Sequence, residues 1–171
     1  MKMRITSNPY AVAPLLKEGI ESGVALRNLQ RQQLATRLKR LANEEYQLMV
    51  KIKVLANTLK KPAFTDIIES ADYFSDKLMA SLNHYVYHIK HLENSAINLP
   101  SIVTQCEPIS YVGWVDRVKE QIAIHLRVKQ QIVDIFVNFP ESEFKEVFHF
   151  LKEQLTLHED ELWHLRNQID A

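Results

Sequence analysis

The chain has 171 residues, of which 46% are hydrophobic and 25% are charged. This composition is that of an ordinary globular domain and argues against disorder along most of the length. Twenty-one basic and twenty-one acidic residues give a formal net charge of zero, so no overall field attracts nucleic acid or anionic lipid. We therefore expect one helical domain over residues 1–171 and no nucleic-acid partner.

Cysteine content and hydropathy indicate the compartment. Cys106 is the only cysteine, so an intrachain disulfide is excluded and a reducing compartment fits best. Nowhere do about eighteen apolar residues occur together, and no signal-type apolar segment follows Met1. We expect a cytoplasmic protein that neither spans a membrane nor is exported.

Prolines divide the chain into four helical blocks, which we place at about residues 12–59, 63–97, 111–138 and 140–169. In the first block, Gly19 and Gly23 can bend or split the helix. Further along that block, residues at alternating steps of four and three form one seam. The seam comprises Leu34, Leu38, Leu41, Glu45, Leu48, Ile52, Leu55 and Leu59.

The remaining blocks also have helical patterns. The second block repeats the seam spacing from Ile67 to Leu92, and Asp66 suits its first turn. The third block is apolar on several sides, which predicts a heavily buried helix or one with contacts on two faces. In the fourth block we expect Asn138 to cap a helix that begins at Pro140.

The connections predict the topology. The turns near residues 61 and 139 are short, so helices one and two, and helices three and four, should form antiparallel pairs. The longer linker at residues 98–110 permits either an up-down-up-down bundle or one with a long crossover. The predicted fold class is all-α, an antiparallel four-helix bundle.

Three polar residues interrupt the apolar seams. Glu45 and His158 stand where the pattern otherwise has leucine, and His125 lies seven residues from both Val118 and Ile132. At about 1.5 Å of rise per residue, all three fall near the middle of their helices. Glu120 and Glu161 lie one turn away from the histidines. The candidate metal ligands are therefore Glu45, His125, His158, Glu120 and Glu161.

Two interpretations of this set remain open. Carboxylates and imidazoles from facing helices are the ligands with which helix bundles hold iron, manganese or zinc. A buried carboxylate is otherwise costly unless it is paired. The alternative is therefore a structural polar pair between Glu45 and His158, or a partly exposed seam.

At these residues the chain resembles the ferritin-like, rubrerythrin-type bundles. In that superfamily a helix carries a glutamate and, three positions later, a histidine, and such pairs hold a di-iron centre. The segment 38–48 is similar, with Leu48 in the histidine place after Glu45, and the segment 148–158 has Leu155 in the glutamate place before His158. The resemblance therefore implies a ferritin-like bundle whose site is degenerate or metal-free.

A second group of histidines lies on the second block. His84, His88 and His91 follow one another beside Tyr85 and Tyr87. The simplest interpretation is an amphipathic boundary of the helix. A surface metal site or a pH-sensing cluster is the alternative.

The sequence holds no phosphate-binding glycine loop, nucleophile elbow or cysteine zinc pattern, so we predict no catalytic residue. Two functions remain. The first is association, as a homodimer or with another protein, which the apolar third block favours. The second is a ferritin-like metal-binding protein or oxidoreductase.

Overall fold

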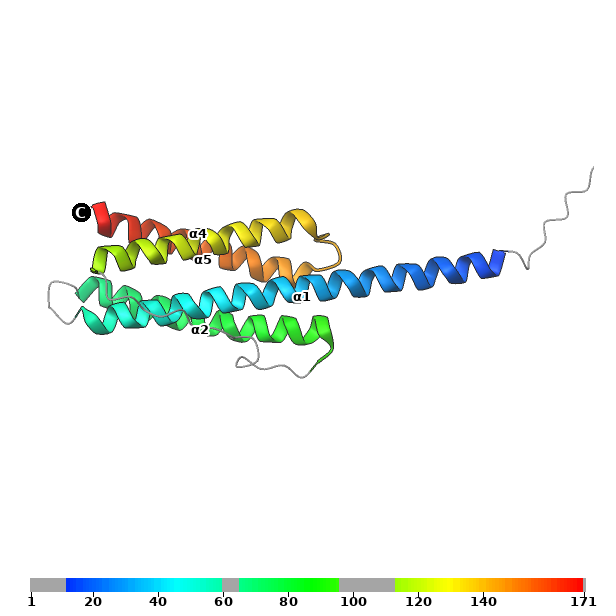
Figure 1. Ribbon diagram of the computed structural model, residues 1–171, viewed down its shortest axis with the longest axis horizontal. Helices are drawn as coiled ribbons and strands as arrows, with labels where there is room; N and C mark the ends of the chain where they lie inside the picture. Colours follow the sequence, from blue (N-terminus) through cyan, green and yellow to red (C-terminus); the bar gives the residue numbers. More distant parts are fainter. Residues whose placement is uncertain (1–11, 60–64, 96–112, 171) are drawn as a thin grey trace, which may run out of the picture.

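The computed structural model describes residues 12–59, 65–95 and 113–170, with side chains on the first helix from residue 22 onward. These ranges contain four helices and no strand: α1 (Val12–Thr58), α2 (Thr65–Glu93), α4 (Trp114–Asn138) and α5 (Lys145–Asp170) (Figure 1). The prediction of an all-α four-helix bundle is confirmed. The predicted linker and residues 96–97 of the second block lie outside the described residues.

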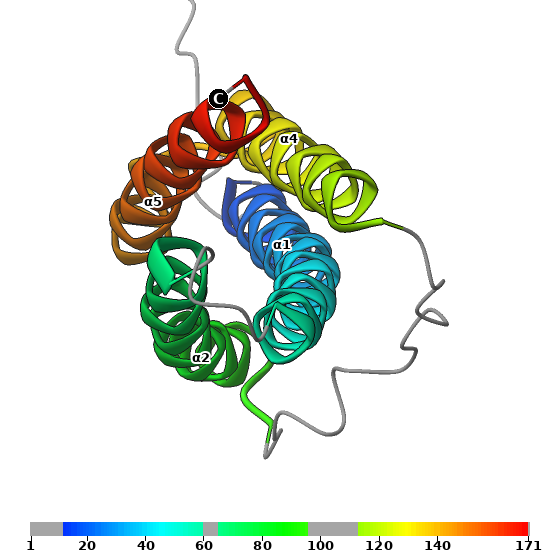
Figure 2. The ribbon, with the colours of Figure 1, turned by 90° about the vertical axis from the view of Figure 1, so that its left-hand side faces the viewer.

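Each helix packs against two others. α1 contacts α2 and α4, and α5 contacts the same two helices, so α1 and α5 face each other across the bundle (Figure 2). Of the four neighbouring pairs, α2 and α5 approach each other least closely. This wider spacing leaves room for pockets between them.

Cross-helix contacts give the direction of each helix. Arg31 bonds to Leu92 and Glu45 bonds to Tyr85, so α1 and α2 are antiparallel. The same pattern joins α1 to α4 through the pairs Glu44–Arg127 and Thr58–Arg117, and α4 to α5 through Phe139–Phe144 and His125–His158. α2 and α4 consequently run in the same direction (Figure 1). This is the order that a long crossover between them produces, and not an up-down-up-down order.

The predicted seams form the core. On α1 the seam leucines and Ile52 are at most 7% exposed, and Phe74, Leu78, Leu82 and Ile89 of α2 are buried opposite them. Leu151 of α5 and Ile124, Val128, Ile132 and Ile135 of α4 complete the main cluster. A smaller cluster around Leu55, Leu59, Val118 and Leu165 closes one end.

The predicted start of the fourth helix is wrong. Residues 141–143 form a turn, in which the backbone N–H of Glu143 donates to the carbonyl of Pro140. α5 begins only at Lys145. Asn138 is not a cap for it, because its side chain donates instead to the carbonyl of Asp134 at 2.6 Å within the last turn of α4.

α1 is much longer than its neighbours. It has 47 residues, against 29, 25 and 26 in the other helices, and its first part leaves the bundle (Figure 1). Residues 22–33 are exposed apart from the half-buried Gln30. We call residues 12–33 the arm. The helix is continuous through Gly23, so the expected bend or split is not seen in the described backbone.

Candidate functional site

The centre of the bundle contains a chain of four fully buried polar side chains, one from each helix. The hydroxyl of Tyr85 donates to Oε1 of Glu45 at 2.7 Å. Nε2 of His158 lies 3.3 Å from the same oxygen. Nδ1 of His158 lies 2.8 Å from Nδ1 of His125. The chain therefore ties the diagonal pair α1 and α5 together and adds one contact from each remaining helix.

The hydrogen positions follow from the carboxylate of Glu45, which lies between Tyr85 and His158. A carboxylate oxygen only accepts, so Nε2 of His158 carries its hydrogen and donates to Glu45. Nδ1 of a neutral His158 is then an acceptor, and His125 donates to it through its own Nδ1–H. This arrangement satisfies every N–H and O–H of the chain with both rings neutral.

Burial keeps the chain in this state. Loss of hydration, followed by the proximity of His158, holds the pKa of His125 well below its usual 6.5. Burial and the neighbouring carboxyl of Glu45 raise the pKa of Tyr85 above its usual range. The Phe74 ring covers both imidazoles, with centroid distances of 5.2 Å to His125 and 6.1 Å to His158. The site therefore favours an uncharged imidazole at His125 and a protonated phenol at Tyr85.

Two buried atoms of the chain have no partner within the described residues: Oε2 of Glu45 and Nε2 of His125. They do not make a metal site as arranged, because Glu45 and His125 contact opposite ring nitrogens of His158. A single ion cannot bond both nitrogens of one imidazole. Across the described ranges, no group of three or more His, Cys, Asp or Glu side chains has the geometry to hold a metal.

The two carboxylates expected to support the site lie elsewhere. Glu120 is 43% exposed and forms an ion pair of 2.5 Å with the ammonium of Lys51. Glu161 is 8% exposed and lines a pocket between α2 and α5. The structure thus brings together Glu45, His125 and His158 of the predicted ligands and separates the other two.

Sequence reasoning missed Tyr85 as a member of the chain. It occupies a seam position and was predicted as core, and its ring does pack edge-on against Phe150 at 4.8 Å. The signal was available, because a buried tyrosine hydroxyl needs a polar partner. A second buried pair was also missed: the Ser81 hydroxyl donates to Oε1 of Gln154 at 2.7 Å.

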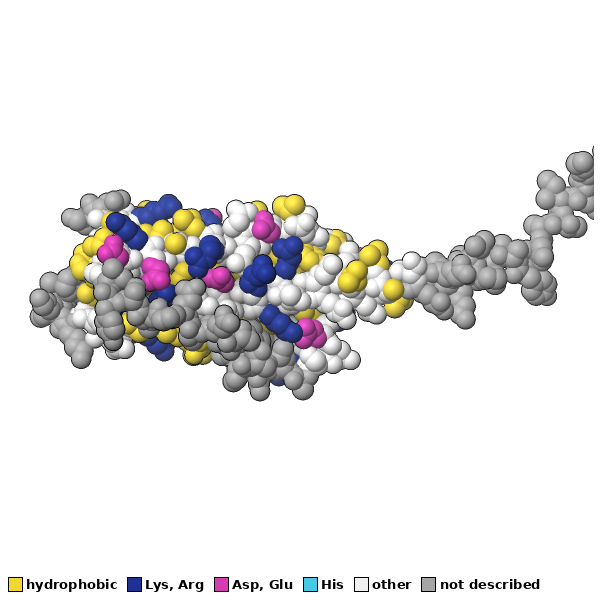
Figure 3. All heavy atoms as spheres, in the orientation of Figure 1, with side chains coloured by type: hydrophobic (Ala, Val, Ile, Leu, Met, Phe, Trp, Pro, Cys, Tyr) yellow, Lys and Arg dark blue, Asp and Glu magenta, His cyan; other side chains and the backbone are white. Residues whose placement is uncertain are grey.

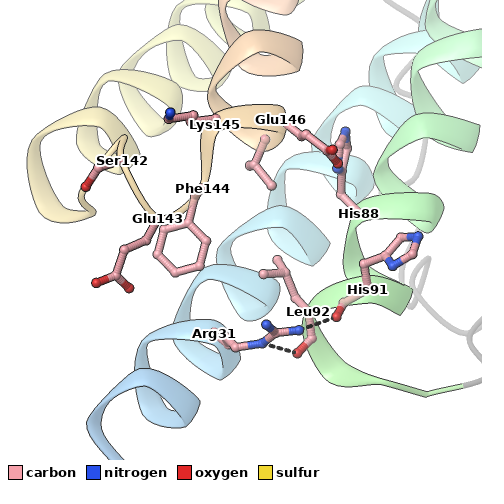
Figure 4. A pocket seen from close by; sticks show the side chains of 10 residues that line it. Arg31, His88, His91, Leu92, Ser142, Glu143, Phe144, Lys145 and Glu146 are labelled. Carbon is pink, nitrogen blue, oxygen red and sulfur yellow. Dashed lines mark hydrogen bonds between the residues drawn. The ribbon is translucent and has the colours of Figure 1, made fainter. Parts of the chain in front are cut away.

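The histidines of α2 face the start of α5. The His84 and His88 rings both lie against Phe150, at centroid distances of 5.6 and 5.1 Å. Burial and the proximity of His84 lower the pKa of His88, and Glu146 opposes that effect. A pocket of about 350 Å³ lies beside His88 and His91, and there Arg31 donates to the carbonyls of His91 and Leu92 (Figure 4). These rings serve mainly as packing surfaces at the edge of the core.

Comparisons with known proteins find no family model that matches the chain and no relative among curated proteins. No helix in the part of the chain that the structure describes is both long and apolar enough to cross a membrane. The functional argument therefore rests on the structure itself.

Proposed function

We propose that this protein acts through association, as a homodimer in which the arms of two copies pair. The observation that carries this proposal is the uncovered apolar surface of the arm. Val24, Leu26 and Leu29 are 52%, 58% and 50% exposed, and they lie in the part of α1, residues 22–33, where only Gln30 is half-buried. Figure 3 shows hydrophobic side chains on α1 where it leaves the bundle.

A helix of this kind needs a partner for physical reasons. The arm spans about 30 Å at 1.5 Å per residue, and its described side chains make almost no buried contacts with the rest of the bundle. Most helical stability in proteins comes from packing of an apolar face. Burying one leucine completely contributes about 1.5–3 kcal/mol, so pairing the arms offsets the cost of ordering them.

The charges of the arm favour a second copy in antiparallel orientation. The acidic residues Glu18 and Glu21 precede the centre of the arm, and the basic residues Arg27 and Arg31 follow it. A two-fold axis between Val24 and Ala25 sets Glu18 opposite Arg31. The same axis sets Glu21 within one residue of Arg27. Two-fold symmetry is also the commonest arrangement of homo-oligomers.

The C-terminal end of the arm is attached to α2 by hydrogen bonds, and a groove lies beside it. Arg31 donates to two terminal carbonyls of α2, at 3.2 Å to Leu92 and 2.5 Å to His91 (Figure 4). Beside it, Val24, Arg27, Glu143 and Phe144 help to line a groove of about 420 Å³. In the proposed dimer this groove, which lies beside residues 24–31 of one copy, is opposite residues 18–25 of the partner's arm on the same two-fold axis.

Sedimentation velocity tests the proposal. The wild-type chain should sediment as a dimer, and the double variant Leu26→Glu, Leu29→Glu as a monomer with unchanged helix content. The matched control is Val133→Glu, Val137→Glu on α4, where both valines are exposed. The control should remain dimeric. A wild-type monomer at about 0.5 mM, or dissociation by the control alone, would refute pairing through the arm.

A second candidate function is a ferritin-like metal-binding protein or oxidoreductase with iron, manganese or zinc. The helix order with a crossover and the buried set Glu45, His125 and His158 favour it. Binding would require His158 to turn away from one of its two partners, so that three side chains face one ion. Elemental analysis after expression with each metal tests this candidate, and less than about a tenth of an equivalent would exclude it.

A further inference from the structure

The pocket between α2 and α5 that Glu161 lines is separate from the pocket and the groove beside the arm. It lies toward the opposite end of the bundle. Its volume is about 330 Å³. Its walls are mainly aromatic and acidic: they include Tyr73, Phe74, Asp160, Glu161 and Trp163, together with the imidazole of His164. None of the described residues that line it is a lysine or an arginine. The pocket thus combines negative charge with apolar walls.

Glu161 is the unusual member of this lining. Its side chain is more than nine-tenths buried, yet within the described residues it has neither a hydrogen bond nor an ion pair. A buried carboxyl without a partner is unfavourable, and burial raises its pKa to about 7. A cation in the pocket would supply the missing partner.

The aromatic residues suit a particular kind of cation. Tyr73 and Trp163 are each 63% exposed at the pocket, which is unusual for such large side chains. The ammonium of Lys77 already lies 5.2 Å from the centre of the Tyr73 ring. Ring faces attract weakly hydrated organic ammonium groups through their quadrupoles. A divalent metal ion requires several oxygen or nitrogen ligands, and the described residues provide no such group here.

We propose that this pocket binds a small organic ammonium ion, with Glu161 as its counter-ion and Trp163 and Tyr73 against its alkyl groups. Phe74 forms the inner wall and separates the ligand from the buried histidines, since its ring also contacts His125 and His158. The site is independent of the arm.

Isothermal titration calorimetry with choline tests the proposal on the full chain at pH 8. The comparison ligand is 3,3-dimethylbutan-1-ol, which has the same shape and no charge. Choline should bind saturably and at least tenfold more tightly than the alcohol. Equal affinities for choline and the uncharged alcohol would overturn the proposal.

Two variants locate the site. Glu161→Gln and Trp163→Leu should each weaken choline binding at least tenfold. The control Glu159→Gln removes a charge two residues away on α5, where Glu159 is 54% exposed and paired with Lys129, and should change affinity less than twofold. Equal losses in Glu159→Gln and Glu161→Gln would mean general electrostatics and overturn the assignment.

Two sources supply such an ammonium group, a free amine and a protein lysine, and a third ligand distinguishes them. Nα-acetyl-lysine methylamide presents the amine as a peptide does. If it binds more tightly than choline, the site recognises a lysine side chain, and the reverse order indicates a free quaternary amine. Failure of both ligands refutes the site.

Discussion

Glu161→Gln should make the protein more stable, and increasingly so as the pH rises. Burial raises the pKa of Glu161 from 4.5 to about 7, so the folded state holds a proton that the unfolded state has already lost. Between these two values the folded protein binds more protons than the unfolded protein. The free energy of unfolding therefore falls as the pH rises through this interval.

The magnitude follows from the interval itself. Each pH unit between the two pKa values is worth about 1.4 kcal/mol, so Glu161 lowers the stability by about 3 kcal/mol above pH 7. The side chain is 8% exposed, and solvent screening therefore removes little of this effect. Glutamine has nearly the same shape and no charge, so the variant avoids the penalty.

Urea unfolding followed by circular dichroism at pH 5, 6, 7 and 8 measures the effect. The difference in unfolding free energy between Glu161→Gln and wild type should grow by about 2–3 kcal/mol from pH 5 to pH 8. The control Glu159→Gln, at an exposed position of the same helix, should show a difference that does not change with pH. A constant difference for Glu161→Gln as well would refute the argument from burial.

Three further predictions concern the buried polar pairs. Glu45→Leu should destabilise the fold by about 2–5 kcal/mol in urea unfolding, because it leaves two buried donors unpaired, and adding Tyr85→Phe should recover about 1 kcal/mol or more. An increase in stability for Glu45→Leu would show that the carboxylate is an unpaired defect. In the Glu161→Gln background, the stability should fall as the pH drops below 6.5, because the unfolded state then protonates His125 and the folded state does not. The additional change His125→Gln should flatten that slope. Gln154→Leu should cost about 0.5–1.5 kcal/mol by removing its hydrogen bond with the Ser81 hydroxyl, which keeps the carbonyl of Lys77 as an acceptor, so adding Ser81→Ala should change the stability little further.

The apolar spacing predicted the fold because it is a local property of each helix. The steps of four and three from Leu34 to Leu59 define one face, and that face is buried. The start of α5 was not predictable from the same pattern. Pro140 is compatible with a first helical turn. However, residues 141–143 form a separate turn, Phe144 packs against Phe139, and the helix begins only after this contact.

The candidate site was predictable only in part. The position of a residue along its helix is easier to calculate from the sequence than the direction in which its side chain points around the helix axis. Equal distances from the turns placed Glu45, His125 and His158 at one level, and all three meet there. Glu120 lies one turn from His125 along α4, but its side chain emerges where Lys51 can reach it. Glu120 and His125 are five residues apart, and a step of five residues rotates a side chain by about 140° around the helix axis. The two side chains therefore point in different directions.

The four interfaces of the bundle have different roles, and their spacing explains why. α1 packs against α4 more closely, with the ion pairs Lys51–Glu120 and Arg127–Glu44 between the two helices. α2 and α5 stand further apart, so the unpaired Glu161 and its aromatic neighbours remain accessible between them. The buried chain from Tyr85 to His125 holds this wider side at a fixed distance, because it joins both α2 and α5 to Glu45 of α1. Loss of Glu45 should therefore loosen the α2–α5 pocket before it affects the α1–α4 interface.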